Sequence, residues 1–329
     1  MQFTQIISKS FLMHPYSFRL LKVLIFLLLV SYAYYQFQSK EFLSQQFFYG
    51  IFYQIQSKSF LFATVLILLP INWGLEALKW KLMVNRFTTI GFFQAYKGVL
   101  AGVALGFATP HGLGDYFGRI GLLNYHNRIS LIGSVFLVRI AQFSITLLAG
   151  GWFLLHFLYR FQLTSFGNIM LFVALLSLLL LVLALVFKRY NIIQKGINWP
   201  LLRNFFGKLS KYSQVEIATV FMLSIVRYLV FSFQFWLLLL LFDMQGNWYL
   251  LVMGINLVFL AKSIIPTLFD LGVREYSAFY FFSVLGLNYT LAVQASLLLW
   301  MVNVFLPAIL GMFFIFSLKF YQKSGKYVD

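Results

Sequence analysis

The strongest constraint on the fold is a series of apolar runs, each long enough to cross a lipid bilayer. Ile169 to Phe187, for example, covers 19 successive positions without a charge, a glycine or a proline, and about 20 apolar residues in a helix span the hydrocarbon core. Comparable runs occupy residues 20–37, 59–78, 130–158, 168–187, 216–242 and 289–318. Because 61% of the residues are hydrophobic and only 10% are charged, the sequence predicts an all-α polytopic membrane protein.

Two further apolar regions, 92–124 and 248–286, are interrupted by short polar turns. The first is broken at TPHGLGDYFGR, Thr109 to Arg119, and the second at PTLFDLGVRE, Pro266 to Glu275. Non-helical backbone is tolerated at membrane depth only where protein or a water-filled cavity satisfies its polar groups. Paired broken segments in two halves of a chain therefore indicate a transport pathway where the segments meet.

The distribution of basic residues predicts the orientation in the membrane. The net charge is +17, but the basic residues lie in short loops, which favours a role in topology over nucleic-acid binding. The connector Lys188 to Tyr212 carries six basic residues and no acid, so we expect it in the cytoplasm. That placement holds only if 92–124 and 248–286 are re-entrant hairpins that enter from the cytoplasm and from outside, respectively.

These assignments predict one transmembrane domain over residues 1–329, with about six full spans and two re-entrant helical hairpins arranged as an inverted repeat. We expect an integral protein of the bacterial inner membrane with both termini in the cytoplasm. The expected parts are a peripheral first helix and outer loop (20–58), a first repeat (59–158), a peripheral helix and basic cytoplasmic loop (159–215), an inverted second repeat (216–318) and a cytoplasmic tail (319–329).

Ionisable residues at membrane depth are the candidates for function, because they are costly there and normally face a partner or a cavity. The candidate substrate-binding residues are Glu76, Asp115, Arg119, Arg139, Arg227, Asp270, Arg274 and Glu275. The alternative is that these acids and arginines only neutralise one another and hold the hairpins together. The expected structural turn residues are Pro110, Gly114, Pro266 and Gly272.

Arg139 and Arg227 are the candidates for binding a phosphate. Each lies well inside its predicted helix, in FLVRIAQF and LSIVRYLV respectively, too far from either end for its side chain to reach the interface. A guanidinium stays charged and binds a lipid phosphate through two hydrogen bonds. Glu76 or Asp115 would serve equally well as the anionic partner.

Catalytic, metal and cofactor sites are not predicted. The chain has no cysteine, no GxxxxGK[ST] nucleotide loop and no His/Asp/Glu set with metal-ligand spacing. An integral-membrane enzyme acting on a lipid-linked substrate, with Asp115, Glu76 or His111 as base, stays open as an alternative. A third possibility is a scaffold for a lipid-synthesising partner.

Three motifs resemble the transmembrane domain of the lysylphosphatidylglycerol synthase/flippase family. NWGLEALKW, Asn72 to Trp80, is similar to the family's Asn-Trp-x-x-Glu-Ala-x-Arg/Lys-Trp element. The turn TPHGLGDYFGR is similar to Thr-Pro-x-x-x-Gly-Glu-x-x-x-Arg, and PTLFDLGVRE to Pro-x-Pro-Gly-Gly-x-Gly-x-x-Glu. The resemblance covers most of the chain and implies a flippase-type domain in a stand-alone form, without the synthase domain of two-domain members.

Several positions depart from the family pattern, and they bear on the substrate more than on the fold. Asp115 stands where glutamate is usual in the family. Val138 and Gln142 replace acids that often flank the arginine at the position of Arg139. Leu268, Phe269 and Asp270 occupy the Pro-Gly-Gly positions.

The expected function is that of a lipid flippase or transporter, which moves a phosphate-bearing lipid between membrane leaflets. Whether the headgroup of that lipid is unmodified, aminoacylated or otherwise modified stays open. Membrane phospholipids are the expected partners and nucleic acid is not. A lipid-synthesising enzyme and a second copy of the chain stay open as further partners.

Overall fold

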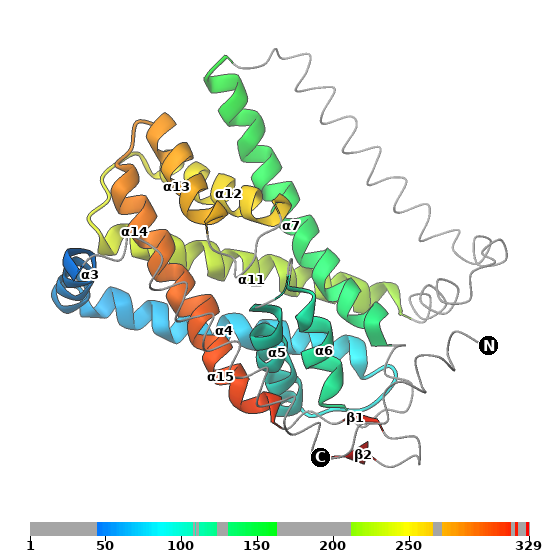
Figure 1. Ribbon diagram of the computed structural model, residues 1–329. Helices are drawn as coiled ribbons and strands as arrows, with labels where there is room; N and C mark the ends of the chain where they lie inside the picture. The colour runs from blue at the N-terminus through cyan, green and yellow to red at the C-terminus, as the bar shows by residue number, and fades with distance from the viewer. Residues whose placement is uncertain are drawn as a thin grey trace.

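The computed structural model describes residues 45–107, 109, 112–123, 131–162, 212–265, 272–316, 320–321 and 327–328 (Figure 1). In this part of the chain, four helical segments are long and apolar enough to cross a membrane: α4 (Ser59–Val84), α7 (Ile132–Arg160), α11 (Gln214–Leu241) and the segment Tyr289–Ile315. They match four of the expected spans, which confirms a helical membrane protein. The spans expected at 20–37 and 168–187 lie outside the described residues.

The remaining described elements are short. α3 (Gln45–Ser57) precedes α4, and the helices α5 (Phe92–Phe107), α6 (Gly114–Gly121), α12 (Trp248–Ile264) and α13 (Val273–Val284) occupy the two interrupted regions. Near the C-terminus, β1 (Phe320–Tyr321) pairs antiparallel with β2 (Tyr327–Val328). In the described residues, a long helix, two short helices and a second long segment follow one another twice, as α4 to α7 and as α11 to α15.

The last long segment is not a regular α-helix throughout. It consists of α14 (Tyr289–Trp300), a π-helical turn η4 (Met301–Phe305) and α15 (Leu306–Ile315). Pro307 cannot donate a backbone hydrogen bond, and the Leu306 N–H donates to the Met301 carbonyl, five residues back. Such turns often occur at functional sites, and this one places Asn303 in the interior, where its side-chain oxygen accepts a hydrogen bond from Asn72 (3.2 Å).

Glycines allow α5 and α6 to form a tight antiparallel hairpin. A Cβ added to Gly118 would collide with the backbone of Gly102, and one added to Gly114 would collide with the carbonyl of Leu105. The pairing of later α6 residues with earlier α5 residues fixes the antiparallel direction. Small residues at such contacts are typical of membrane helices, because close van der Waals packing replaces the hydrophobic effect as the driving force there.

The two halves are joined along α4 and α11, which run in opposite directions (Figure 1). The Lys58 ammonium donates to the carbonyls of Leu240 and Leu241 at one end, and Gln234 Nε2 donates to the Val65 carbonyl further along. Contacts also cross between the halves at the hairpins: α5 packs against α15, and α12 packs against α7. Each hairpin therefore lies on the final long helix of the other half.

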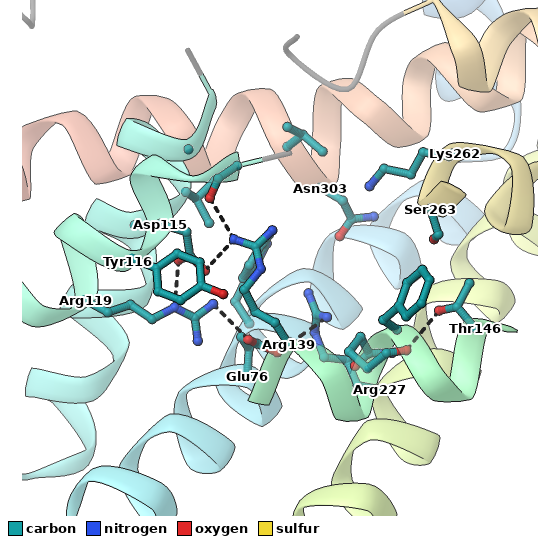
Figure 2. A pocket seen from close by; sticks show the side chains of 18 of the residues that line it. Glu76, Asp115, Tyr116, Arg119, Arg139, Thr146, Arg227, Lys262, Ser263 and Asn303 are labelled. Atoms are coloured by element: carbon teal, nitrogen blue, oxygen red, sulfur yellow. Dashed lines mark hydrogen bonds and ion pairs between the residues drawn. The ribbon is translucent and has the colours of Figure 1, made fainter. Parts of the chain in front are cut away.

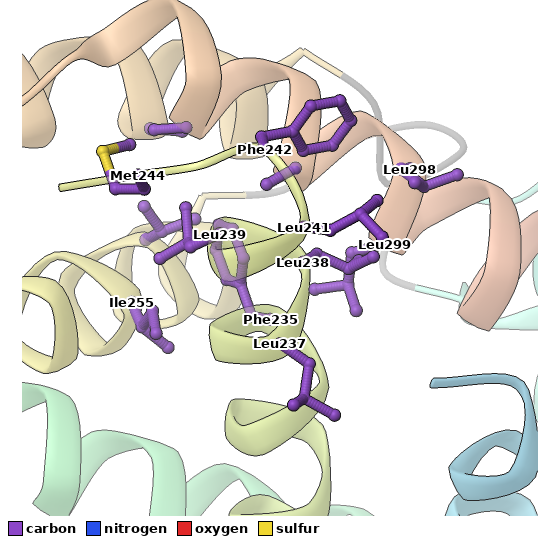
Figure 3. Packing of buried hydrophobic residues seen from close by; sticks show 14 of the residues in the cluster. Phe235, Leu237, Leu238, Leu239, Leu241, Phe242, Met244, Ile255, Leu298 and Leu299 are labelled. Carbon is purple, nitrogen blue, oxygen red and sulfur yellow. The ribbon is translucent and has the colours of Figure 1, made fainter. Parts of the chain in front are cut away.

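Apolar clusters hold these helices together. In the largest, Phe235 and Leu238 of α11 pack with Ile255 of α12 and Leu299 of α14 (Figure 3). A smaller apolar cluster contains residues of α4, α5, α6 and α7 and surrounds the first hairpin. Large apolar side chains such as Phe60, which is 81% exposed, point away from the protein; lipid is their natural environment in a membrane-spanning helix.

Candidate functional site

A cavity of about 670 Å³ lies where the two halves meet, and the ends of both short-helix pairs contribute to its wall (Figure 2). From the first hairpin come Gly106 and Gly112, on either side of the break between α5 and α6. From the second half come Lys262 and Ile264, at the end of α12. The first predicted interruption and the end of the helix before the second are thus brought to one site.

Glu76 of α4 is the centre of a buried ion-pair network. Its Oε1 lies 2.8 Å from Arg119 Nη2, and its Oε2 lies 2.8 Å from Lys79 Nζ and 3.4 Å from Arg227 Nη1. The carboxylate is 5% exposed, so these cations replace the water that would otherwise solvate it. One acid from the first half therefore holds basic residues of α4, α6 and α11.

Asp115 and Arg119 lie one turn apart on α6, in the polar break of the first hairpin. Asp115 Oδ1 accepts a hydrogen bond from Arg119 Nε at 2.6 Å, a separation typical of a strong charge-assisted bond. Because Arg119 also contacts Glu76 and is nearly fully buried, it is neutralised from two sides. It links α6 to α4 and is the best-held arginine of the network.

Arg139 of α7 is more accessible than Arg119. Its Nη1 donates to the carbonyl of Gly112 at 2.7 Å and lies 3.5 Å from Asp115 Oδ2. The guanidinium also stacks over the ring of Tyr116, 5.4 Å from its centroid. With its side chain 33% exposed, Arg139 presents part of its charge to the cavity.

Arg227 lies at the middle of α11, about 20 Å from either end of the helix at 1.5 Å per residue. It faces the cavity, with its guanidinium over the Trp73 ring, 5.1 Å from the centroid. Its 3.4 Å contact with Glu76 is longer than the 2.7–2.9 Å of a strong charged hydrogen bond. The two arginines singled out from sequence thus both line the cavity.

Three polar residues that the sequence did not single out as site residues complete the network. The fully buried Lys79 donates to Gln142 Oε1 (2.9 Å) and Ser224 Oγ (3.2 Å) in addition to its ion pair with Glu76. Gln142 comes from α7 and Ser224 from α11, so the lysine joins three long helices. The sequence offered one indication of this role: in NWGLEALKW, Lys79 lies one turn after Glu76 on the same helix face, where the two side chains can pair.

Arg274 and Glu275 lie in the second hairpin and are not among the residues that line this cavity. Arg274 is fully buried; its Nε donates to Ser296 Oγ of α14 (3.1 Å) and its Nη2 lies 3.0 Å from Glu275 Oε1. Glu275 Oε2 also accepts from the Gly272 N–H at the start of α13 (2.7 Å). In the described residues, this pair caps α13 and fastens it to α14.

The turn residues can be placed only in part. Gly114 begins α6 at its close contact with α5, and Gly272 precedes α13 with a φ of +97°, which glycine adopts at low cost. Pro110, Pro266 and Asp270 lie outside the described residues. His111, the alternative base, lies outside them as well.

The arrangement is suited to binding an anion. Within the described residues, no group of three or more His, Cys, Asp or Glu side chains could hold a metal ion. The cavity wall instead combines arginines from α6, α7 and α11 with Lys262 from α12. Lys262 lies four residues before Pro266 in the sequence. It reaches the wall of this cavity because the end of α12 lies beside the first half of the chain.

The family model for the lysylphosphatidylglycerol synthase TM region matches residues 19–311, which is most of the chain. Comparisons with curated proteins and with solved structures gave no match.

Proposed function

The chain belongs to the lysylphosphatidylglycerol synthase TM-region family, and from this premise we propose that it moves a phosphate-bearing lipid between the leaflets of its membrane. Membership of the family supports a function connected with membrane lipids. The observation that carries the proposal is the cavity between the long apolar helices, which Arg139 and Arg227 both line.

The headgroup would bind between these two arginines. A guanidinium presents parallel N–H donors that fit two phosphate oxygens, and it stays charged in a medium of low dielectric constant. Both arginines contact their carboxylates at 3.4–3.5 Å, longer than a strong charged hydrogen bond, so a phosphate could replace these two contacts with shorter ones. Glu76 and Asp115 then balance the charge.

The lipid would be moved by a change in the position of one half of the protein relative to the other. α4 and α11 run antiparallel, and each hairpin packs on the last long helix of the opposite half, which supports the inverted repeat expected from loop charge. In transporters built this way, one half rocks against the other around a central site. We propose that the two hairpins alternately open the cavity to the cytoplasmic and the outer leaflet of the inner membrane, with both termini cytoplasmic.

Leaflet exchange of a fluorescent phosphatidylglycerol in proteoliposomes tests the proposal. We expect purified protein to accelerate exchange, and Arg139→Gln or Arg227→Gln to reduce the rate about tenfold or more, the effect of losing a charged hydrogen bond. Arg86→Gln is the matched control, because Arg86 is half exposed and lies in the turn after α4, outside the cavity lining.

Exchange rates that are equal in empty and protein-containing vesicles would refute transport. Mass spectrometry of the same lipids decides the enzyme alternative: a new product made by the wild-type protein, and absent from empty vesicles, would establish catalysis instead.

A further inference from the structure

The charges around the cavity do not balance. Within the described residues, the ion-pair network around the cavity joins four basic side chains to two carboxylates: Lys79, Arg119, Arg139 and Arg227 to Glu76 and Asp115. The network therefore carries an excess of two positive charges.

Neither carboxylate is available to a cationic group. Glu76 lies within 3.4 Å of Lys79, Arg119 and Arg227, and Asp115 lies within 3.5 Å of Arg119 and Arg139. An ammonium group in the headgroup would have to compete with the two or three basic side chains that already contact each carboxylate. Like charges in a site of low dielectric constant repel strongly.

The polar atoms left without a partner point to the same conclusion. Among the described residues lining the cavity, four buried nitrogens lack a hydrogen-bond acceptor: Trp73 Nε1, Arg119 Nη1, Arg227 Nε and Asn303 Nδ2. All four belong to donor groups. The buried oxygen without a hydrogen bond in this wall, Glu76 Oε2, faces Lys79 at 2.8 Å. A ligand with hydrogen-bond acceptors would pair with these four donors, whereas an ammonium group has only donors and could not.

We propose that the cavity selects a lipid headgroup with two or more negative charges and no ammonium group, that is, a phosphomonoester or diphosphate headgroup. Two ionised phosphate oxygens would face Arg139 and Arg227, and the remaining oxygens would accept from the unpartnered donors. A zwitterionic or aminoacylated lipid would bind less tightly. This inference rests on the proposed function for the lipid nature of the ligand, but its selectivity can be measured without transport.

Equilibrium binding by native mass spectrometry provides the test. The full chain in detergent is titrated at pH 8 with dioleoyl lipids that differ only in the headgroup: phosphatidic acid, phosphatidylglycerol, phosphatidylethanolamine and lysylphosphatidylglycerol. A phosphomonoester carries close to two negative charges at this pH. We expect phosphatidic acid to bind about tenfold more tightly than phosphatidylglycerol, since it adds one ionised oxygen opposite an arginine, and the other two lipids to bind more weakly still.

Variants connect the selectivity to the cavity. Arg139→Gln and Arg227→Gln should reduce the preference for phosphatidic acid to about threefold or less, while Arg86→Gln should leave it unchanged. Arg139→Lys keeps the charge, so a retained preference in that variant together with loss in Arg139→Gln separates charge recognition from misfolding. Unequal loss between the two arginines is compatible with the proposal, whereas full retention in both glutamine variants would overturn it.

The remaining outcomes separate the inference from the proposed function. Tightest binding of lysylphosphatidylglycerol or phosphatidylethanolamine would overturn the inference even if lipid exchange is observed. Selective binding of phosphatidic acid, with no protein-dependent leaflet exchange of fluorescent phosphatidic acid or phosphatidylglycerol, would support the inference and refute transport. Equal affinity for soluble glycerol 3-phosphate would retain polyanion selectivity but assign a water-soluble ligand, which would overturn a lipid-specific site.

Discussion

Replacement of Glu76 by glutamine would leave three cations, two of them buried, without their common carboxylate. Lys79 and Arg119 lie 2.8 Å from Glu76 and Arg227 lies 3.4 Å away, and the side chains of the first two are 0% and 4% exposed. Removing one partner of a buried ion pair typically costs about 3–5 kcal/mol, because the remaining charge stays desolvated. We expect Glu76→Gln to lower the free energy of unfolding by about this amount.

The assay is unfolding of the purified protein by a denaturing detergent in mixed micelles, followed by circular dichroism. Asp243→Asn is the matched control: Asp243 pairs with Lys58 at 2.6 Å, but its side chain is 61% exposed, and exposed pairs contribute about 1 kcal/mol or less. Adding Lys79→Met to Glu76→Gln removes one of the stranded charges and should recover part of the loss. Equal stability of Glu76→Gln and Asp243→Asn would refute the view that Glu76 neutralises this network.

Three further predictions follow from other parts of the structure. Gly118→Ala should destabilise the protein by about 1–3 kcal/mol through its clash with α5, whereas Gly151→Ala, with no atom near its added Cβ, should be neutral or slightly stabilising. In intact cells, an impermeant maleimide should label cysteine at Gln245 but not at Thr89; equal labelling of both would contradict the opposite entry of the hairpins. Arg139→Lys should weaken binding of phosphatidylglycerol several-fold, because lysine cannot form the paired guanidinium contact, and unchanged affinity would show that charge alone suffices.

Much of the fold could be predicted from apolar length and loop charge. A helix of about 20 apolar residues has few alternatives in a bilayer, and α4, α7, α11 and the segment Tyr289–Ile315 lie where the runs indicated. The breaks between α5 and α6 and between α12 and α13 lie where the polar turns were predicted. Proline, glycine and charge do not by themselves interrupt a helix, because Pro70, Gly74 and Glu76 all lie within the continuous α4. The sequence expectation for five site residues, Glu76, Asp115, Arg119, Arg139 and Arg227, placed them at membrane depth, and the structure joins them in one network.

The partners of these residues could not be predicted, because they depend on how helices far apart in sequence are aligned. Gln142 and Ser224 look like ordinary polar residues in apolar helices until α7 and α11 place both beside Lys79. Arg274 and Glu275 resemble cavity residues in sequence, yet α13 directs them to its own N-terminus and to Ser296 of α14. Residue type and depth identify a charge that needs a partner, but only the packing decides whether that partner is a neighbouring helix or a ligand.

The different lengths of the ion pairs suggest how an anion can enter and leave the same site. Arg119 is held at 2.6 Å by Asp115 and at 2.8 Å by Glu76, so it keeps the carboxylates in place whether or not a ligand is bound. Arg139 and Arg227 contact the same two acids at 3.5 and 3.4 Å, and a phosphate that approaches them exchanges a long ion pair for a short one. When the phosphate leaves, the carboxylates again accept the guanidinium groups, so no unpaired cation is left in a medium where its cost would be prohibitive. Under the proposed transport function, this difference would let Arg119 hold the two acids while Arg139 and Arg227 exchange a carboxylate for a phosphate.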